Sequence, residues 1–321
     1  MARKRRTLFA SAGAPGYDRG MTSALAPSFS SISIEVGRPP QRLVMAGLAN
    51  YAPGARPDLI WLHANGFNAR TYLNTLGPLA DRMAILIADQ RGHGATPQQS
   101  AIEEKTDALD MRDDLLGLLE AIGPGAPVVL GGHSMGGCVS LLAAAEAPAQ
   151  VRALALFDPV ILSRAATAAA IERRGFAESE GGLIGKARSR RRHFPSREAA
   201  FETYRQRSAF KTWPQAALRD YVQAGFRDLA DGTVELACAP EWEAAVFAAH
   251  AHDIWAAMAR VEAPVHIWRA EEGSTCSIET ADAFPRPSGQ VSVVTVPGST
   301  HFLPIERPEV VQQALRRLIE A

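Results

Sequence analysis

The strongest chemical signal in the sequence is the pattern Gly132-x-Ser134-x-Gly136. It follows the apolar run Val128–Gly131 and leads into a helix-compatible segment, Gly136–Ala145. A sharp turn from strand to helix leaves no room for side chains at the flanking positions, and it lifts the serine out of the sheet. Ser134 would then lie at a helix N-terminus, where free N–H groups favour developing negative charge. The pattern therefore predicts that Ser134 is a nucleophile.

A serine hydroxyl is too weakly acidic to attack unaided and needs an adjacent base near neutral pH. The chain has eight histidines. Only His301 lies near the C-terminus in a loop between a predicted strand, Val291–Val296, and a predicted helix, Glu309–Ile319. We expect His301 to be the general base.

The elements that must position these residues are visible as apolar runs of strand length that alternate with helical segments from Ile32 onward. Several runs are continuously apolar, as strands buried on both faces of a sheet should be. The alternation predicts an α/β fold with a mostly parallel eight-stranded sheet flanked by helices. The predicted strands are Ile32–Val36, Arg42–Ala49, Leu59–His63, Ala84–Asp89, Val128–Gly131, Ala153–Phe157, Val265–Arg269 and Val291–Val296. The predicted helices include Ala108–Ile122, Gly136–Ala145 and Glu309–Ile319.

One stretch breaks the alternation, because from Ser163 to about Met258 the sequence contains no convincing strand. About ninety residues are too many for a loop. We expect a helical cap over residues 163–258, inserted between the sixth and seventh strands. Residues 31–162 and 259–321 would then form the core.

The first thirty residues open with four basic residues and continue in Ala, Ser, Gly and Pro. They lack the continuous apolar core of a secretory signal. We expect residues 1–30 to be a disordered tail whose first twenty residues are dispensable for activity. Met21 is an alternative start of the native protein.

Together with the serine turn, three further segments resemble the α/β-hydrolase fold family over nearly all of residues 32–321. They are Trp61–Asn68 after an early strand, Asp89-Gln90-Arg91-Gly92-His93-Gly94 after the next, and Pro297–Pro304 after the last. The resemblance implies a Ser-His-acid triad, with His301 as the base. It also implies an oxyanion hole made of the main-chain N–H groups of Phe67 and Met135. Most relatives have His-Gly where this chain has Asn65-Gly66.

The acid of the triad is ambiguous in the sequence. Many relatives place an Asp in the loop after the strand that corresponds to Val265–Arg269. That loop here contains Glu271 and Glu272 but no Asp, and Ser274 stands in the expected place. Asp158 follows the preceding strand, a position that some hydrolases of this fold use. We assign Asp158, with the Glu271/Glu272 pair and a triad without an acid as alternatives.

Several other chemically suggestive residues are interpreted as structural. They are His63 and Asn65 in the oxyanion loop, Asp89, Arg91 and His93 in the following turn, His266 in a strand, and Cys138 under the serine turn. His250 and His252 are two residues apart and make a poor metal pair. The Arg188–Arg192 cluster is interpreted as a solvated face of the cap, with recognition of an anionic substrate as the alternative.

Composition excludes several classes of function. Apolar residues make up 47% of the chain, and its 34 basic and 34 acidic residues give no net charge. This balance gives no electrostatic reason to expect a nucleic-acid or membrane-surface partner. Three scattered cysteines fit a reducing compartment, so we expect a cytoplasmic location. There is no dinucleotide or phosphate-loop motif, and we expect neither a metal nor an organic cofactor.

These observations predict a hydrolase that cleaves a carboxylic ester of a small, largely apolar substrate through an acyl-enzyme. Lactones, thioesters and small amides come second. A serine at the turn argues against haloalkane dehalogenases and epoxide hydrolases, which use an Asp there. Carbon–carbon bond hydrolases, cofactor-free haloperoxidases and a non-catalytic sensor of small molecules stay open. The sequence leaves the oligomeric state unknown.

Overall fold

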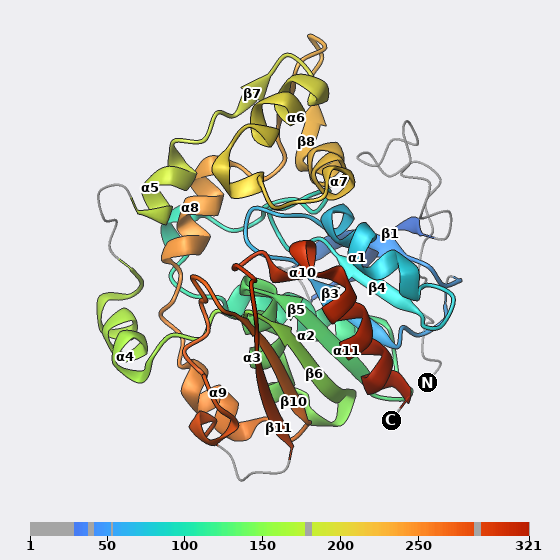
Figure 1. Cartoon of the computed structure of the whole chain (residues 1–321), viewed down its shortest axis with the longest axis vertical. Coiled ribbons are helices and arrows are strands. Elements are labelled where there is room, and N and C mark those ends of the chain that lie inside the picture. The colour runs from blue at the N-terminus through green and yellow to red at the C-terminus, as the bar shows by residue number, and fades with distance from the viewer. Residues whose placement is uncertain (1–28, 38–41, 53, 177–181, 286–289, 321) are drawn as a thin grey trace.

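The computed structural model describes residues 29–37, 42–52, 54–176, 182–285 and 290–320 (Figure 1). The predicted tail lies outside the described residues except for its last two positions, as does the alternative start at Met21. Ser30, the last predicted tail residue, already begins the first strand.

The core is one eight-stranded sheet in the order β1-β2-β4-β3-β5-β6-β10-β11. The strands are β1 (Ser30–Val36), β2 (Leu43–Ala49), β3 (Leu59–Leu62), β4 (Ile85–Ala88), β5 (Val128–His133), β6 (Val151–Phe157), β10 (Val265–Ala270) and β11 (Val291–Val296). β1 pairs antiparallel with β2, and β2 with β4, whereas all pairs from β4 to β11 are parallel. The mostly parallel eight-stranded sheet predicted from the sequence is confirmed.

Helices cover both faces of the sheet. One face packs against α2 (Leu109–Ala121), α3 (Met135–Glu146) and α9 (Ile254–Arg260), and the other against α1 (Leu73–Leu76) and α11 (Pro308–Glu320). The buried positions of α2 include Met111, Leu115 and Leu118, the spacing of one helix face. The remaining core helix is α10 (Leu303–Glu306), which lies just before α11.

A second group of elements follows β6 in the chain, and most of this group lies above the sheet in Figure 1. Between β6 and β10 the chain forms α4 (Arg164–Arg173), α5 (Leu183–Arg188), α6 (Arg197–Arg205), α7 (Gln215–Gly225) and α8 (Pro240–Ala248), followed by α9. It also forms a three-stranded sheet of β7 (His193–Phe194), β8 (Phe226–Asp228) and β9 (Val234–Leu236). The prediction of a purely helical insertion was therefore wrong in one respect, because strands of two or three residues leave no periodic pattern in a sequence.

The C-terminal end of this insertion also differs from the predicted boundary at Met258. α9 buries Ile254, Ala257 and Met258 in the core cluster that contains α3. It is the helix that returns the chain from β6 to the parallel neighbour β10. None of the helices in the described ranges is long and apolar enough to cross a membrane.

Candidate active site

Ser134 occupies the turn between β5 and α3 with a positive φ of 55°. A non-glycine residue tolerates this conformation only where its surroundings hold it. The flanking glycines show why the turn requires them. A Cβ on Gly132 would lie 2.4 Å from the carbonyl carbon of Gly136, and one on Gly136 would lie 2.3 Å from the carbonyl oxygen of Leu62 in β3. The tight packing of this turn against β3 therefore fixes the position of the serine.

The structure brings Ser134, His301 and Asp158 into one chain of hydrogen bonds. The Nε2 atom of His301 lies 3.0 Å from the Oγ atom of Ser134. The Nδ1 atom of His301 lies 2.6 Å from the Oδ2 atom of Asp158. The three residues come from the ends of β5 and β6 and from the loop after β11, which meet at the carboxyl edge of the sheet. The arrangement has the geometry in which a histidine removes a serine proton while a carboxylate orients its ring.

Asp158 is held by several further donors. Its Oδ1 atom accepts from the Ala270 N–H at 2.8 Å and from the Ser274 hydroxyl at 2.5 Å, and its Oδ2 atom accepts from the Thr275 N–H at 3.1 Å. Burial alone would raise the pKa of Asp158, but the hydrogen bond and charge of His301, with help from Ser274 and Ala270, lower it below its ordinary value. The carboxylate therefore stays ionised beside His301.

The alternative acids of the β10 loop do not reach the histidine. Glu271 is exposed and its carboxylate accepts the Gly298 N–H at 2.8 Å. Glu272 is also exposed, and its N–H donates to the Ser299 carbonyl. Of the carboxylates considered in the sequence, the structure places Asp158 at His301.

The oxyanion loop departs from the expectation at Phe67. The Phe67 N–H closes a turn with the Ala64 carbonyl at 3.1 Å, so this donor is already committed. The Asn65 N–H has no hydrogen-bond partner within the described ranges, and Asn65 lines a cavity together with Ser134. Met135 begins α3, where main-chain N–H groups lack partners inside the helix. The free donors next to Ser134 are thus those of Asn65 and Met135.

The residues interpreted as structural hold the loops around the site. Asp89 accepts from the N–H groups of Ala69 and Ala95, and Arg91 forms two bonds of 2.6 Å with Asp114. His63 accepts from the Gln90 N–H at 2.9 Å. His93 accepts from the Gly66 N–H at 3.0 Å and so fixes the oxyanion loop. Burial lowers the pKa of His93 to about 4, which keeps this acceptor neutral.

His133 is a positioning residue that sequence reasoning missed. Its ring lies 5.0 Å from the ring of His301, its Nε2 atom is 2.7 Å from the His301 carbonyl oxygen, and its Nδ1 atom is 2.8 Å from the Tyr72 hydroxyl. Burial and the neighbouring His301 lower the pKa of His133. Only its place beside Ser134 in the sequence could have singled it out.

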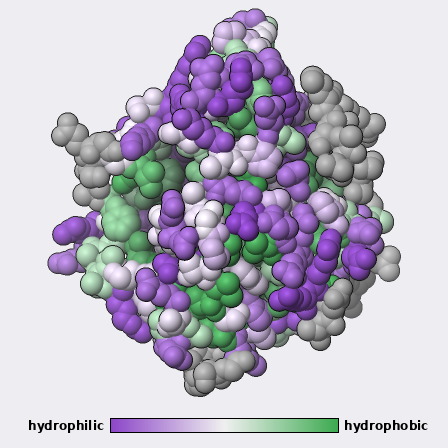
Figure 2. Space-filling model, viewed as in Figure 1, coloured by the Kyte–Doolittle hydropathy of each residue, from purple (hydrophilic) through white to green (hydrophobic). Residues whose placement is uncertain are grey.

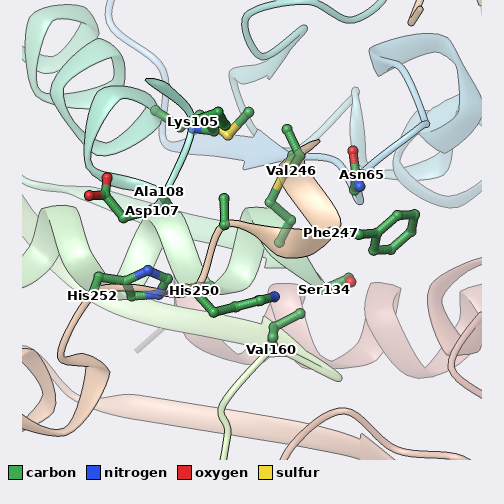
Figure 3. A pocket seen from close by; sticks show the side chains of 14 residues that line it. Asn65, Lys105, Asp107, Ala108, Ser134, Val160, Val246, Phe247, His250 and His252 are labelled. Atoms are coloured by element: carbon green, nitrogen blue, oxygen red, sulfur yellow. Dashed lines mark hydrogen bonds between the residues drawn. The ribbon is translucent and has the colours of Figure 1, made fainter. Parts of the chain in front are cut away.

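Two cavities meet at Ser134. The larger has a volume of about 1390 Å³ and is lined by Ser134, His301 and the inserted elements. Leu183, which also lines it, is 63% exposed, so the cavity reaches the surface at α5. Figure 2 shows hydrophobic residues gathered at the left of the view, over α5 and α8. The smaller cavity measures about 30 Å³ and is drawn in Figure 3, where Ser134, Asn65 and Phe247 lie together on one side.

The interpretation of the Arg188–Arg192 cluster as a solvated face was wrong for Arg190. Its side chain is only 14% exposed and forms an ion pair with Glu243. Its Nη2 atom also donates to the hydroxyls of Tyr204 at 3.2 Å and Tyr221 at 2.9 Å. The larger cavity is lined by these residues and by Lys186, Arg207 and Arg269, so its wall contains several basic side chains.

His250 and His252 also line the smaller cavity (Figure 3). Their ring centroids are 5.9 Å apart, and the Nε2 atom of His252 lies 3.3 Å from the Cys138 sulfur. Burial lowers the pKa of His250 to about 3 and of His252 to about 4. Within the described part of the chain, no group of three or more His, Cys, Asp or Glu residues could hold a metal ion.

Comparison with known proteins places these observations in context. The model of the "Alpha/beta hydrolase family" matches residues 59–314. A "2-(acetamidomethylene)succinate hydrolase" of Mesorhizobium japonicum is 26% identical over 270 residues, which are 84% of this chain and 90% of the relative. The crystal structure of an E-2-(acetamidomethylene)succinate hydrolase aligns with a TM-score of 0.70 at 23% identity, covering 91% of this chain and all of that one. An esterase of M. tuberculosis aligns with a TM-score of 0.68 at 21% identity, covering 92% and 93%.

Proposed function

This chain belongs to the alpha/beta hydrolase family, and from that premise we propose that it is a serine hydrolase that cleaves an acyl bond of a small molecule through an acyl-enzyme. The observation that carries the proposal is the unbroken contact from Ser134 Oγ through His301 to Asp158, with distances of 3.0 Å and 2.6 Å, at the wall of a large cavity.

In the proposed first step, His301 removes the Ser134 proton as the Oγ atom attacks the substrate carbonyl carbon. Asp158 holds the ring by its Nδ1 atom and stabilises the imidazolium. The N–H groups of Met135 and Asn65 are the proposed donors to the oxyanion, and each such donor typically contributes about 2.7–4 kcal/mol in comparable sites. We propose Asn65 in place of Phe67 because the Phe67 N–H is bonded to Ala64.

When the tetrahedral intermediate collapses, His301 gives its proton to the leaving group and the acyl-enzyme remains. His301 then takes a proton from a water molecule, which attacks the acyl carbon. When the second tetrahedral intermediate collapses, His301 returns that proton to the Oγ atom of Ser134 and the acid is released. His133 supports the cycle by bonding the main chain of His301, which limits the freedom of the base to turn away from Ser134.

An ester is the first candidate for the cleaved bond, since it is the commonest activity on this fold. An amide is the second candidate. The relative with 26% identity is named for 2-(acetamidomethylene)succinate, a compound with an acetamide group and two carboxylates. A matched pair, p-nitrophenyl acetate and p-nitroacetanilide, separates the two because only the bonded atom differs.

The test begins with a fluorophosphonate probe and intact-mass spectrometry on the wild type and Ser134→Ala. We expect one adduct that the variant lacks, together with a fall in kcat of about 10⁴ or more on the cleaved substrate. The variant should keep the free energy of unfolding within about 1 kcal/mol, because it removes only an oxygen atom.

An adduct without turnover of ester or amide would redirect the search to carbon–carbon cleavage, to haloperoxidase chemistry or to a sensor role. The absence of an adduct would show that Ser134 is not activated, and the proposal would fall.

A further inference from the structure

The two cavities at Ser134 differ in size and in the groups that line them. The described residues that line both include Asn65, Ser134 and Phe247. Figure 3 shows the smaller cavity extending from Ser134 past Val246 toward Lys105 and the two histidines. A substrate bound at the nucleophile can therefore extend in two directions.

The position of His301 decides which part of the substrate goes where. His301 is among the residues that line the larger cavity and is not among those that line the smaller one. The histidine must hand its proton to the leaving group, so the leaving group has to lie on the His301 side. The acyl part then points away from His301 into the smaller cavity. Departure of the leaving group frees space next to His301 for the hydrolytic water.

The smaller cavity limits the length of the acyl part. Its volume of about 30 Å³ is enough for roughly two water-sized groups. Apolar side chains form part of its wall, among them Met111 of α2, Val160 after β6, and Val246 and Phe247 of α8. An acetyl or propionyl group fits these dimensions, and longer acyl chains do not.

The larger cavity contains a cluster of anion-binding groups. The guanidinium carbons of Arg190 and Arg207 lie 5.9 Å and 5.2 Å from the centroid of the Tyr204 ring. Arg190 is paired with Glu243, whereas Arg207 has no carboxylate partner among the described residues. The cluster therefore contains one carboxylate and two guanidinium groups, and its net positive charge is available to bind an anion.

The phenols of this cluster add neutral donors. The hydroxyls of Tyr204 and Tyr221 each accept a hydrogen bond from Arg190, which leaves their O–H groups available to a ligand. Burial raises the pKa of Tyr221, so its phenol stays protonated. The cluster also borders the oxyanion loop, since a Cβ on Gly66 would lie 3.4 Å from the Nη1 atom of Arg190.

We infer that the substrate is a short-chain acyl ester or amide of an acidic alcohol or amine: the acyl group occupies the small cavity, and a carboxylate of the leaving group binds the Arg190–Tyr204–Arg207 cluster. This inference rests on the proposed function for the bond that is cleaved. The binding of the carboxylate does not depend on it.

The first experiment compares 4-acetoxybenzoate with 4-acetoxybenzamide, which have nearly the same shape and differ in the charge of the distal group. Release of the phenol is followed, and each rate is corrected for spontaneous hydrolysis. We expect kcat/KM to be at least about tenfold higher for the carboxylate, with a preference that weakens as salt is added. Equal kcat/KM for the two esters would overturn the inference.

Variants identify the side chain whose charge produces the preference for the carboxylate ester. Arg207→Gln should remove most of the preference for the carboxylate ester, because it deletes the guanidinium group that pairs with no carboxylate in the described ranges. Arg205→Gln is the matched control, since Arg205 pairs with Glu202 on the surface and does not line the cavity. A preference that survives Arg207→Gln would overturn the assignment to this cluster.

A binding measurement separates this inference from the proposed function. Isothermal titration with 4-hydroxybenzoate and 4-hydroxybenzamide needs no catalysis. We expect the anion alone to bind the wild type and Arg205→Gln, and to bind Arg207→Gln at least about tenfold more weakly. Binding of the anion with no fluorophosphonate adduct would support the cluster and refute the nucleophile, whereas an adduct with no such binding would do the reverse.

The acyl side is tested with p-nitrophenyl esters of increasing chain length. We expect kcat/KM to fall by at least about tenfold between propionyl and hexanoyl, because only small groups fit the cavity. Val246→Ala should raise turnover of the butyryl ester, and Val44→Ala, a change at an exposed position of β2, should not. A wild type that prefers long acyl chains would overturn this half of the inference.

Discussion

Asp158, the proposed acid of the triad, contacts His301 from the end of β6. Ser274 in the β10 loop donates to its other carboxylate oxygen at 2.5 Å. The loop that holds the acid in many relatives here holds a hydroxyl that stabilises a neighbouring acid. Ser274 therefore lies beside the carboxylate that contacts the His301 ring.

We predict that Asp158→Asn lowers kcat by about 10⁴, because the imidazolium loses its carboxylate and the ring can adopt the wrong tautomer. The double variant Asp158→Asn/Ser274→Asp should recover at least about tenfold of that loss, because it returns a carboxylate within reach of the same ring. Steady-state kinetics on the best ester would measure both.

The matched control for this pair is Glu272→Gln, which changes an exposed carboxylate of the same loop and should leave kcat unchanged. If Glu272→Gln is the damaging change, the acid lies in the β10 loop. If Asp158→Asn keeps full activity, His301 needs no carboxylate.

At the scale of residues, the sequence predicted the side chains of the site better than it predicted which main-chain N–H groups of the oxyanion loop are free. Ser134, His301 and Asp158 each follow a strand end, and parallel strands bring such ends to one edge of a sheet. Which N–H of the oxyanion loop is free depends on a turn between Ala64 and Phe67 that no residue pattern specifies. Arg190 looked like a surface residue because its partners Glu243 and Tyr221 are distant in the chain.

At the scale of elements, the turn at Ser134 depends on close packing between its own backbone and the backbone of β3. A Cβ at Gly136 would lie 2.3 Å from the Leu62 carbonyl oxygen, an atom of a central strand that cannot move aside. We predict that Gly136→Ala costs about 3 kcal/mol or more of the free energy of unfolding, measured by urea denaturation.

Gly225, the last residue of α7, is the control for that substitution. Its nearest non-neighbouring atom to a new Cβ is the Asn68 side chain at 3.5 Å, an ordinary contact. Gly225→Ala should therefore be neutral or stabilise by up to about 1 kcal/mol. Equal destabilisation by both substitutions would show that the clash at Gly136 does not govern the turn.

The elements themselves were predictable where burial imposes a pattern. All eight strands of the main sheet and the helices α2, α3 and α11 lie within two residues of the predicted ranges, because each buries a continuous run or one helix face. The insertion was not predictable in the same way. Its small sheet consists of β7, β8 and β9, which are too short to show alternation, and its packing over the cavity depends on contacts between distant segments.

For the molecule as a whole, the buried histidines set the response to acid. Burial lowers the pKa of His93 to about 4, against 6.5 in the unfolded chain, and His63, His250 and His252 are shifted in the same direction. Between pH 6.5 and about pH 4 the histidines of the unfolded chain bind protons that the buried histidines of the folded chain do not. The free energy of unfolding therefore falls as the pH falls through this range. Asp220 has the opposite effect. Burial raises the pKa of its carboxyl group to about 6, so the folded state binds a proton there at a higher pH than the unfolded state does, which stabilises the folded state as the pH falls.

We predict that the free energy of unfolding drops by about 3 kcal/mol or more between pH 7 and pH 4.5, at roughly 1.4 kcal/mol per unit for one fully shifted histidine. Urea titrations across this range would measure the drop, and recovery after return to neutral pH would separate it from aggregation. A free energy of unfolding that is flat over the range would contradict the exclusion of protons from these histidines.

The insertion begins after β6 and ends before α9, the helix that leads back to β10. In topological terms it is a single enlarged loop of one strand–helix–strand unit, and Ser134, Asp158 and His301 all lie outside it. The Arg190–Tyr204–Arg207 cluster lies inside it, so the proposed recognition of the leaving group and the proposed chemistry come from separate stretches of the chain. Mutations confined to residues 182–249 can accumulate, recombine or be exchanged between homologues while the nucleophile persists, so a library restricted to that stretch can change which molecules are accepted while a fluorophosphonate still reports an intact serine in each member.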